Sequence, residues 1–200
     1  NAKCKVDLIY MPAKERRFHT YAIMIAGGAY MSVCTIAESM QIGAKLNECG
    51  MDCFCLNYRV TDKTKFDQGL FPMPMDDLAA AWQVIKEHEK EFGLDAADYI
   101  VGGSSAGGHL TVTWGTANHG ARHYGIPQPK MLVPEYPLVS LDRIAERAEQ
   151  AAKNGEKDMR GFLQIAMLGA GYTRDDARAY DASCQMDPAY PPFYLVRAVD

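Results

Sequence analysis

The 200-residue sequence predicts an α/β fold with a mostly parallel central sheet and helices on both of its faces. Short apolar runs alternate with stretches of helical periodicity along most of the chain, as in a parallel sheet covered on both sides. Two of these runs, at residues 21–28 and 98–103, end in glycine pairs. The length favours one domain with a single large core.

Composition and charge narrow the classes of partner. Hydrophobic residues make up 48% of the chain and charged residues 23%, as in ordinary globular proteins. The net charge is only -4 and no Lys/Arg run occurs, so neither nucleic acid nor an anionic membrane is an expected partner. No apolar run is long enough to span a bilayer.

The six cysteines match no zinc-binding spacing and include no C-x-x-C motif. Cys53 and Cys55 alternate within an apolar run, so we expect them to share one face of a strand as small core residues. This use of cysteine favours a reducing, cytoplasmic location over a disulfide framework, and secretion stays open as the alternative.

Strands are expected wherever a short apolar run is bounded by polar or glycine-containing turns. The run VDLIYM is the first example, and PPFYLVRAV, close to Asp200, is the last. The expected strands lie within residues 6–11, 21–28, 51–60, 98–103, 130–140 and 191–199.

Three helices are expected between these strands. Residues 36–49 have a helical pattern that stops at Gly50, which can adopt the left-handed conformation that ends a helix. After a polar, proline-containing loop, apolar residues recur at helical spacing through 75–92, and Gly93 follows. The third helix is expected from Ala106 to about Asn118.

Residues 142–182 break this alternation of strands and helices. They read as mostly helical and are expected to form a small insertion, or cap, over one end of the sheet. The chain then reaches Asp200 on a strand with no covering helix after it. We therefore expect one domain over residues 1–200 that lacks its C-terminal part.

The segment VGGSSAGGHL contains two adjacent serines in a glycine-rich setting. The motif G-x-S-x-G fits residues 103–107 and selects Ser105 as a nucleophile, leaving Ser104 as a small packing residue. A serine on a tight strand-to-helix turn has a strained backbone, which small neighbours make possible. The alternative is a turn that merely connects strand to helix, but the strand before it and the helix after it favour the nucleophile.

A second glycine motif, AGGAY, covers residues 26–30. Glycine lets main-chain N–H groups approach a substrate oxygen closely, and such donors stabilise the negative charge that develops during acyl transfer. The expected donors of this oxyanion hole are the N–H groups of Gly28 and Ala29, together with that of Ala106 directly after the nucleophile. A plain strand-to-helix turn is the alternative.

Five motifs occur in an order that resembles the α/β-hydrolase superfamily. They are AGGAY, LNYRV, GSSAGGHL, EYPLVS and YPPFYLVRAVD. They look most like the esterase branch that contains hormone-sensitive-lipase-like enzymes and bacterial carbohydrate acetyl esterases. The chain departs from that pattern at Ala26, where the family has His or Pro, and at Ala29, where it has a third glycine.

The resemblance implies an α/β-hydrolase fold and a serine esterase. Such an enzyme cleaves short-chain, acetyl-type esters, for example on carbohydrates, through an acyl-enzyme. The expected partner is a small-molecule ester, and neither a cofactor nor a metal is expected. A serine peptidase of the same fold is one alternative, although Ala106 after the nucleophile favours an esterase. A non-catalytic binding protein of the same fold is another.

The family's triad runs in the order Ser, Asp or Glu, His. Asp200, or the residue after it, is expected to be the acid, and the histidine is expected beyond residue 200. None of the five histidines lies after His123. His109, four residues after Ser105, is expected to be a helix residue that supports the site by hydrogen bonds rather than the base. Loss of catalysis, or His119 or His123 serving out of order, are alternatives.

Overall fold

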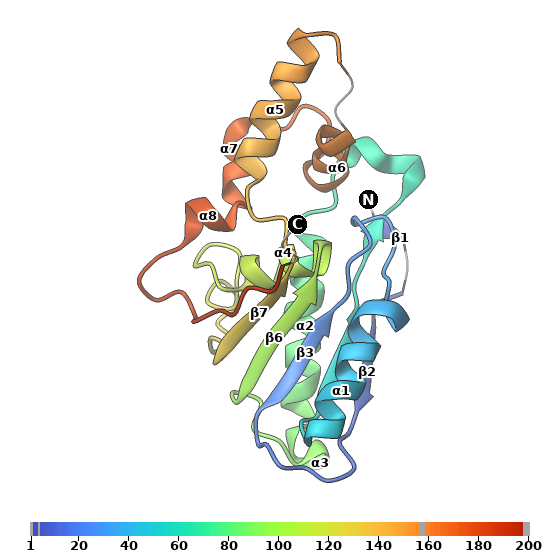
Figure 1. The fold of residues 1–200 in the computed structure, drawn as a ribbon, viewed down its shortest axis with the longest axis vertical. Coiled ribbons are helices and arrows are strands. Elements are labelled where there is room, and N and C mark those ends of the chain that lie inside the picture. Colours follow the sequence, from blue (N-terminus) through green and yellow to red (C-terminus); the bar gives the residue numbers. More distant parts are fainter. Residues whose placement is uncertain (1, 4, 157–158, 198–200) are drawn as a thin grey trace.

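The structure is a computed structural model that describes residues 2–3, 5–156 and 159–197. Its main sheet has five strands (Figure 1). Across the sheet they are β2 (Asp7–Met11), β4 (Cys53–Asn57), β3 (Tyr21–Ile25), β6 (Tyr99–Ser104) and β7 (Met131–Glu135). All neighbours pair in parallel except β2, which runs antiparallel to β4. The prediction of a mostly parallel sheet is confirmed. A small second sheet pairs β1 (Ala2–Lys3) with β5 (Val60–Thr61).

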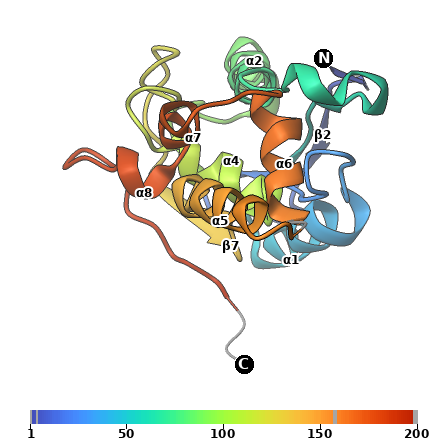
Figure 2. The ribbon, with the colours of Figure 1, turned by 90° about the horizontal axis from the view of Figure 1, so that it is seen from above.

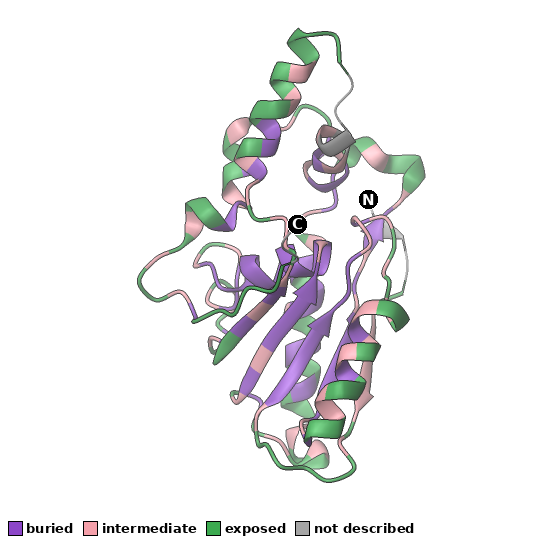
Figure 3. Ribbon diagram, viewed as in Figure 1, coloured by how far each residue is buried: buried purple, intermediate pink, exposed green. Residues whose placement is uncertain are grey.

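The strands are apolar on both faces, because helices cover both (Figures 1 and 3). Residues such as Ile23 and Phe54 belong to the larger core cluster, which includes side chains of helices α2 and α4. Cys53 and Cys55 belong to a second cluster on the opposite face, under α1. The expectation that these two cysteines share a face as core residues is confirmed.

Up to residue 115 the helices differ from the predictions mainly at their ends, and a 3₁₀-helix forms within the loop expected before residue 75. They are η1 (Ile36–Met40, a π-helix), α1 (Gln41–Cys49), η2 (Lys63–Gln68, a 3₁₀-helix), α2 (Met73–Glu87), α3 (Glu89–Phe92) and α4 (Ala106–Trp114). Gly50 and Gly93 take left-handed conformations at helix ends, with φ of 92° and 66°, as predicted. His88, with φ −107° and ψ 13°, divides the helix expected at 75–92 into α2 and α3.

The described residues between 141 and 185 form four further helices, which we call the helical segment. They are α5 (Leu141–Lys153), α6 (Met159–Leu168), α7 (Arg174–Ala179) and α8 (Ala182–Gln185). The helical segment lies beyond one end of the sheet, where the parallel strands have their carboxyl ends, and Figure 2 shows it from above. It is joined to the loop before α2 by the Met167 carbonyl, which accepts hydrogen bonds from the N–H groups of Leu70 (2.8 Å) and Phe71 (2.9 Å).

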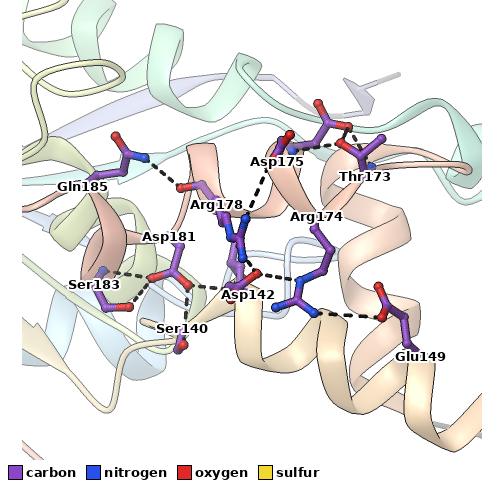
Figure 4. A network of polar contacts seen from close by, with 12 residues as sticks. Ser140, Asp142, Glu149, Thr173, Arg174, Asp175, Arg178, Asp181, Ser183 and Gln185 are labelled. Carbon is purple, nitrogen blue, oxygen red and sulfur yellow. Dashed lines mark hydrogen bonds and ion pairs between the residues drawn. The ribbon is translucent and has the colours of Figure 1, made fainter.

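A polar network holds α5, α7 and α8 together (Figure 4). Asp142 accepts hydrogen bonds from Nε of Arg174 (2.6 Å) and of Arg178 (3.1 Å). The buried carboxylate of Asp181 accepts from the N–H groups of Asp142 and Ser183, both at 2.9 Å. Because these groups lie in the first turns of α5 and α8, one carboxylate caps two helices.

The strand expected at residues 191–199 forms only in part. Phe193 and Val196 make isolated parallel bridges to Leu132 and Glu135 of β7, so this stretch lies along the edge of the sheet. Residues 198–199 lie outside the described part of the chain. Within the described part, no helix is long and apolar enough to cross a membrane.

Candidate active site

Ser105 lies at the turn between β6 and α4, where the sequence predicts a nucleophile. Its backbone has φ 52° and ψ −111°, a conformation that a residue with a side chain adopts at a cost of about 1–3 kcal/mol. Two hydrogen bonds hold it there. The Ser105 N–H donates to the Glu135 carbonyl over 3.0 Å, and the Ser105 carbonyl accepts from the His109 N–H over 2.9 Å. The turn is thus fixed from β7 on one side and from α4 on the other.

The glycines of the motif are required by the close approach of β3. A Cβ on Gly107 would lie 2.0 Å from the Ile25 carbonyl oxygen, and a Cβ on Gly103 would lie 2.5 Å from the same atom. Both distances are far below van der Waals contact, so side chains at these positions would push the turn away from β3. The spacing G-x-S-x-G therefore reflects the packing of the turn against the neighbouring strand.

The loop at residues 26–30 passes directly beside Ser105. A Cβ on Gly27 would lie 2.9 Å from Cβ of Ser105. The next three residues all have positive φ: Gly28 (136°), Ala29 (55°) and Tyr30 (59°). Such a run turns the main chain sharply, and it is favourable for glycine but costly for the other two. The structure thus brings together two motifs that lie about 75 residues apart in sequence.

In both the AGGAY motif and the turn at Ser105, some main-chain N–H groups have no protein acceptor among the described residues. The Gly27 N–H donates to Oε2 of Glu38 over 2.5 Å. Within the described part of the chain, the N–H groups of Gly28, Ala29 and Ala106 donate to no protein acceptor. Buried or half-buried N–H groups are usually paired, so free donors beside Ser105 suit an incoming acceptor. These three positions stay the predicted donors of an oxyanion hole.

Several groups support the loop at 26–30 and were not predicted from the sequence. The Tyr58 hydroxyl donates to the Ala26 carbonyl over 3.0 Å, and the Glu38 carboxylate accepts from Gly27 as described. The Tyr30 hydroxyl lies 3.0 Å from the Ala106 carbonyl and 2.6 Å from Nδ1 of His109. The tyrosines of the AGGAY and LNYRV motifs are the sequence signal that could have indicated these contacts.

Ser104 is buried, as expected for a packing residue, and it also makes a hydrogen bond. Its hydroxyl donates to Oε2 of Glu135 over 2.8 Å. Both side chains line a hollow of about 620 Å³ on the α1 side of the turn, together with Glu38 and Tyr136. The hollow therefore lies next to the turn, and Gln41 and Lys45 of α1 add further polar side chains to its wall.

The imidazole ring of His109 is fully buried, and its nitrogen atoms contact groups other than Ser105. Its Nδ1 lies 2.6 Å from the Tyr30 hydroxyl, and its Nε2 lies 2.8 Å from the Tyr180 carbonyl. Burial lowers the pKa of His109 to about 4, so the ring is neutral near pH 7. These contacts agree with the expected supporting role.

The base of a triad is not placed by the described residues. His119 stacks on Tyr180 at a centroid distance of 4.1 Å, and His123 lies next to it. Neither ring makes a hydrogen bond to Ser105 within the part of the chain that the structure describes. Asp200, the expected acid, lies outside the described residues. The described residues also contain no group of three or more His, Cys, Asp or Glu side chains that could hold a metal ion.

Comparisons with solved structures show the fold. An acetyl ester-xyloside bifunctional hydrolase from Caldicellulosiruptor lactoaceticus superposes with a TM-score of 0.70 at 22% identity, over 94% of this chain and 64% of that one. Esterase 2 from Thermogutta terrifontis, in a form phosphonylated by sarin, gives a TM-score of 0.69 at 18% identity, over 98% and 71% of the two chains. The architecture is therefore the α/β-hydrolase fold, as the sequence predicted.

Sequence comparisons show the family. An acetylxylan esterase from Xylanibacter ruminicola is 27% identical over 159 residues, which are 78% of this chain and 30% of that protein. The chain thus spans less than a third of its curated relative and just under two thirds of the C. lactoaceticus hydrolase. The BD-FAE family model matches residues 7–198, almost the whole sequence. The chain therefore belongs to the BD-FAE family.

Proposed function

We propose that the full-length protein is a serine esterase that cleaves short-chain, acetyl-type esters on carbohydrates. The observation that carries the proposal is the position of Ser105, on a strained turn directly beside the loop at 26–30. A serine in this position can attack an acyl carbonyl while free N–H groups receive the developing negative charge. In comparable enzymes each such donor is worth roughly 3–4 kcal/mol of transition-state stabilisation.

The proposed reaction has two steps. Ser105 Oγ bonds to the acyl carbon as a triad histidine takes the hydroxyl proton, and the alcohol leaves with that proton. Water then attacks the acyl-enzyme, which releases the carboxylic acid and restores the serine. The histidine is expected beyond residue 200, oriented by Asp200 or its neighbour. The donors to the oxyanion are the N–H groups of Gly28, Ala29 and Ala106.

The choice of substrate is supported by the relatives. The X. ruminicola protein is named an acetylxylan esterase, and the C. lactoaceticus protein is named an acetyl ester-xyloside hydrolase. We propose that the helical segment, which contains the residues 142–182 expected to form a cap, shapes the pocket for the alcohol part of the ester. Its position beyond the carboxyl ends of the strands supports this role, because ligands of α/β sheets bind at that edge.

Hydrolysis of p-nitrophenyl acetate by the full-length protein and by its Ser105→Ala variant tests the proposal. Loss of a triad serine is expected to lower kcat by at least 10³-fold. Ser104→Ala is the matched control and should keep most of the activity. Release of acetate from acetylated xylan tests the substrate class. Equal rates for the wild-type protein and Ser105→Ala would refute the assignment.

A further inference from the structure

The imidazole of His109 joins three parts of the molecule that are far apart in sequence. His109 itself belongs to α4, which begins directly after Ser105. Its Nδ1 meets the hydroxyl of Tyr30, the residue after Ala29 in the loop at 26–30. Its Nε2 meets the carbonyl of Tyr180, which ends α7 of the helical segment. One buried ring therefore connects the turn of the nucleophile, the proposed oxyanion loop and the proposed cap.

The chemistry of the two contacts determines the tautomer. A carbonyl oxygen can only accept, so Nε2 must carry the ring hydrogen and donate it to Tyr180. In the neutral ring, Nδ1 is then an acceptor, so the Tyr30 hydroxyl donates to it. The hydroxyl also lies 3.0 Å from the Ala106 carbonyl, so its one hydrogen is shared between that carbonyl and the nearer Nδ1, at 2.6 Å. Tyr30 is only 2% exposed, and burial raises its pKa well above the usual value, so the hydroxyl keeps its proton. Each contact therefore has one direction.

Contacts between aromatic rings also link the loop at 26–30, α4 and the helical segment. The Phe71 ring makes edge contacts with the rings of Tyr30 (centroids 5.3 Å apart), His109 (5.7 Å) and Tyr180 (4.7 Å). The loop at 26–30 contains two non-glycine residues with positive φ, Ala29 and Tyr30. Such a conformation persists only when the surrounding structure fixes it. The bond from Tyr30 to His109 fixes it at the residue next to a proposed oxyanion donor.

We infer that His109 is a positioning residue, which holds the N–H groups of Gly28 and Ala29 toward Ser105 through Tyr30 and couples that loop to the helical segment through Tyr180. The inference rests on the proposed esterase function. Placement errors of about 1 Å at a reacting centre can cost on the order of 100-fold in rate. The contact should therefore act on kcat, because an oxyanion hole binds the transition state more strongly than the substrate.

The first test compares two tyrosine variants in the full-length protein. Tyr30→Phe removes the hydroxyl that meets both His109 and the Ala106 carbonyl. Tyr190→Phe is the matched control, because the Tyr190 hydroxyl also contacts α4, at the Val112 carbonyl over 2.6 Å, but lies outside the site. We expect kcat on p-nitrophenyl acetate to fall about 10- to 100-fold in Tyr30→Phe, with KM changed less than about 3-fold. The Tyr190→Phe variant should keep its kcat.

The second test uses the two amides that resemble the two halves of imidazole. Asparagine places its amide near the position of Nδ1, and glutamine places its amide near that of Nε2. His109→Asn retains an acceptor for Tyr30, so its kcat should stay within about 5-fold of the wild type. His109→Gln retains only the donor to Tyr180, so its kcat should fall as in Tyr30→Phe. A role in stability alone would not separate these two variants by kcat, since both remove the same ring.

The outcomes distinguish this inference from the proposed function. If the wild-type protein shows no hydrolysis that depends on Ser105, the proposed function fails, and the inference fails with it. If the wild-type protein is active but Tyr30→Phe keeps its kcat, or His109→Asn loses as much as His109→Gln, only the inference is overturned. The His109 pair decides by itself, because both of its variants leave the contact between Tyr30 and the Ala106 carbonyl in place. Should one of the His109 variants fail to fold, an unchanged kcat of Tyr30→Phe still overturns the inference.

Discussion

The hydroxyl of Ser104 donates to Oε2 of Glu135 over 2.8 Å, whereas within the described residues the hydroxyl of Ser105 has no protein partner. The two adjacent serines therefore have different environments. Ser104 is 1% exposed and its bond goes to a carboxylate that lines the adjacent hollow. Ser105 is partly exposed on a strained backbone. Substitution of Ser104 should therefore lower mainly the stability of the protein, whereas substitution of Ser105 should abolish its activity.

Ser104→Ala is expected to lower the free energy of unfolding by about 1–2 kcal/mol, because a buried hydrogen bond to a carboxylate is lost. The ester hydrolysis that depends on Ser105 should persist, since Ser104 contributes no group to the proposed oxyanion hole. Urea denaturation and p-nitrophenyl acetate kinetics measure the two effects. A Ser104→Ala variant as inactive as Ser105→Ala would show that the motif had been assigned to the wrong serine.

The backbone of Ser105 provides a second prediction. With φ 52° and ψ −111°, this position suits glycine better than any residue with a Cβ. Neither Ser105→Ala nor Ser105→Gly can supply a nucleophile, so both should be inactive. We expect Ser105→Gly to be the more stable of the two by about 1 kcal/mol, because relief of backbone strain exceeds the entropic cost of glycine. Equal urea midpoints for the two variants would argue against strain at the turn.

Two helical glycines form a matched pair for testing the packing of the turn. A Cβ on Gly107 in α4 would lie 2.0 Å from the Ile25 carbonyl oxygen, whereas a Cβ on Gly43 in α1 would lie 3.1 Å from the sulfur atoms of the Met11 and Cys53 side chains. Gly107→Ala should therefore destabilise by about 3 kcal/mol or more, because main chain must move. Gly43→Ala should stay within about 1 kcal/mol of the wild type, since alanine favours the helix. Urea denaturation measures both, and a tolerated Gly107→Ala would contradict the close approach of β3.

The features that could be predicted from the sequence are those encoded by residues next to one another in the chain. The strands, the helix stops at Gly50 and Gly93 and the turn at Ser105 are encoded in runs of a few residues. The contacts that shape the site join distant positions, such as the hydroxyl of Tyr58 to the carbonyl of Ala26 and His109 to Tyr180. The tyrosines of the AGGAY and LNYRV motifs mark candidate donors, but no local pattern specifies which acceptor each donor will meet, so these pairings required the three-dimensional structure.

The burial of His109 predicts a pH dependence of stability. Its pKa is lowered from 6.5 to about 4, mainly by burial, against smaller opposing effects of the hydrogen bond to the Tyr180 carbonyl and of the nearby Asp181. The unfolded chain therefore binds a proton between about pH 6.5 and pH 4 that the folded chain does not bind. The contribution of His109 to the free energy of unfolding is fully present above pH 6.5. It decreases by on the order of 3 kcal/mol as the pH falls toward 4.

Urea midpoints measured from pH 7 to pH 4.5 check this dependence. Carboxylates also titrate in this range, so the informative quantity is the difference between the wild type and His109→Gln, which has no ionisable group at the position. The wild type should lose more stability on acidification than the variant. Parallel curves for the two proteins would mean that His109 takes up its proton equally well in the folded and unfolded states.

Asp181 gives the last prediction, because its single carboxylate caps two helices. It accepts from the N–H groups of Asp142 in α5 and Ser183 in α8, and it is fully buried. Each cap is worth about 1 kcal/mol, so Asp181→Ala should cost about 2 kcal/mol or more. Asp175→Ala is the control, since its side chain is 91% exposed and, among the described residues, pairs only with Arg178 over 3.5 Å. That variant should change stability by less than about 0.5 kcal/mol.

Hydrogen exchange locates the effect. In Asp181→Ala the amides of Asp142 and Ser183 should both exchange faster, since they donate to the same carboxylate. Faster exchange at one of them alone would show that the two helices are capped independently.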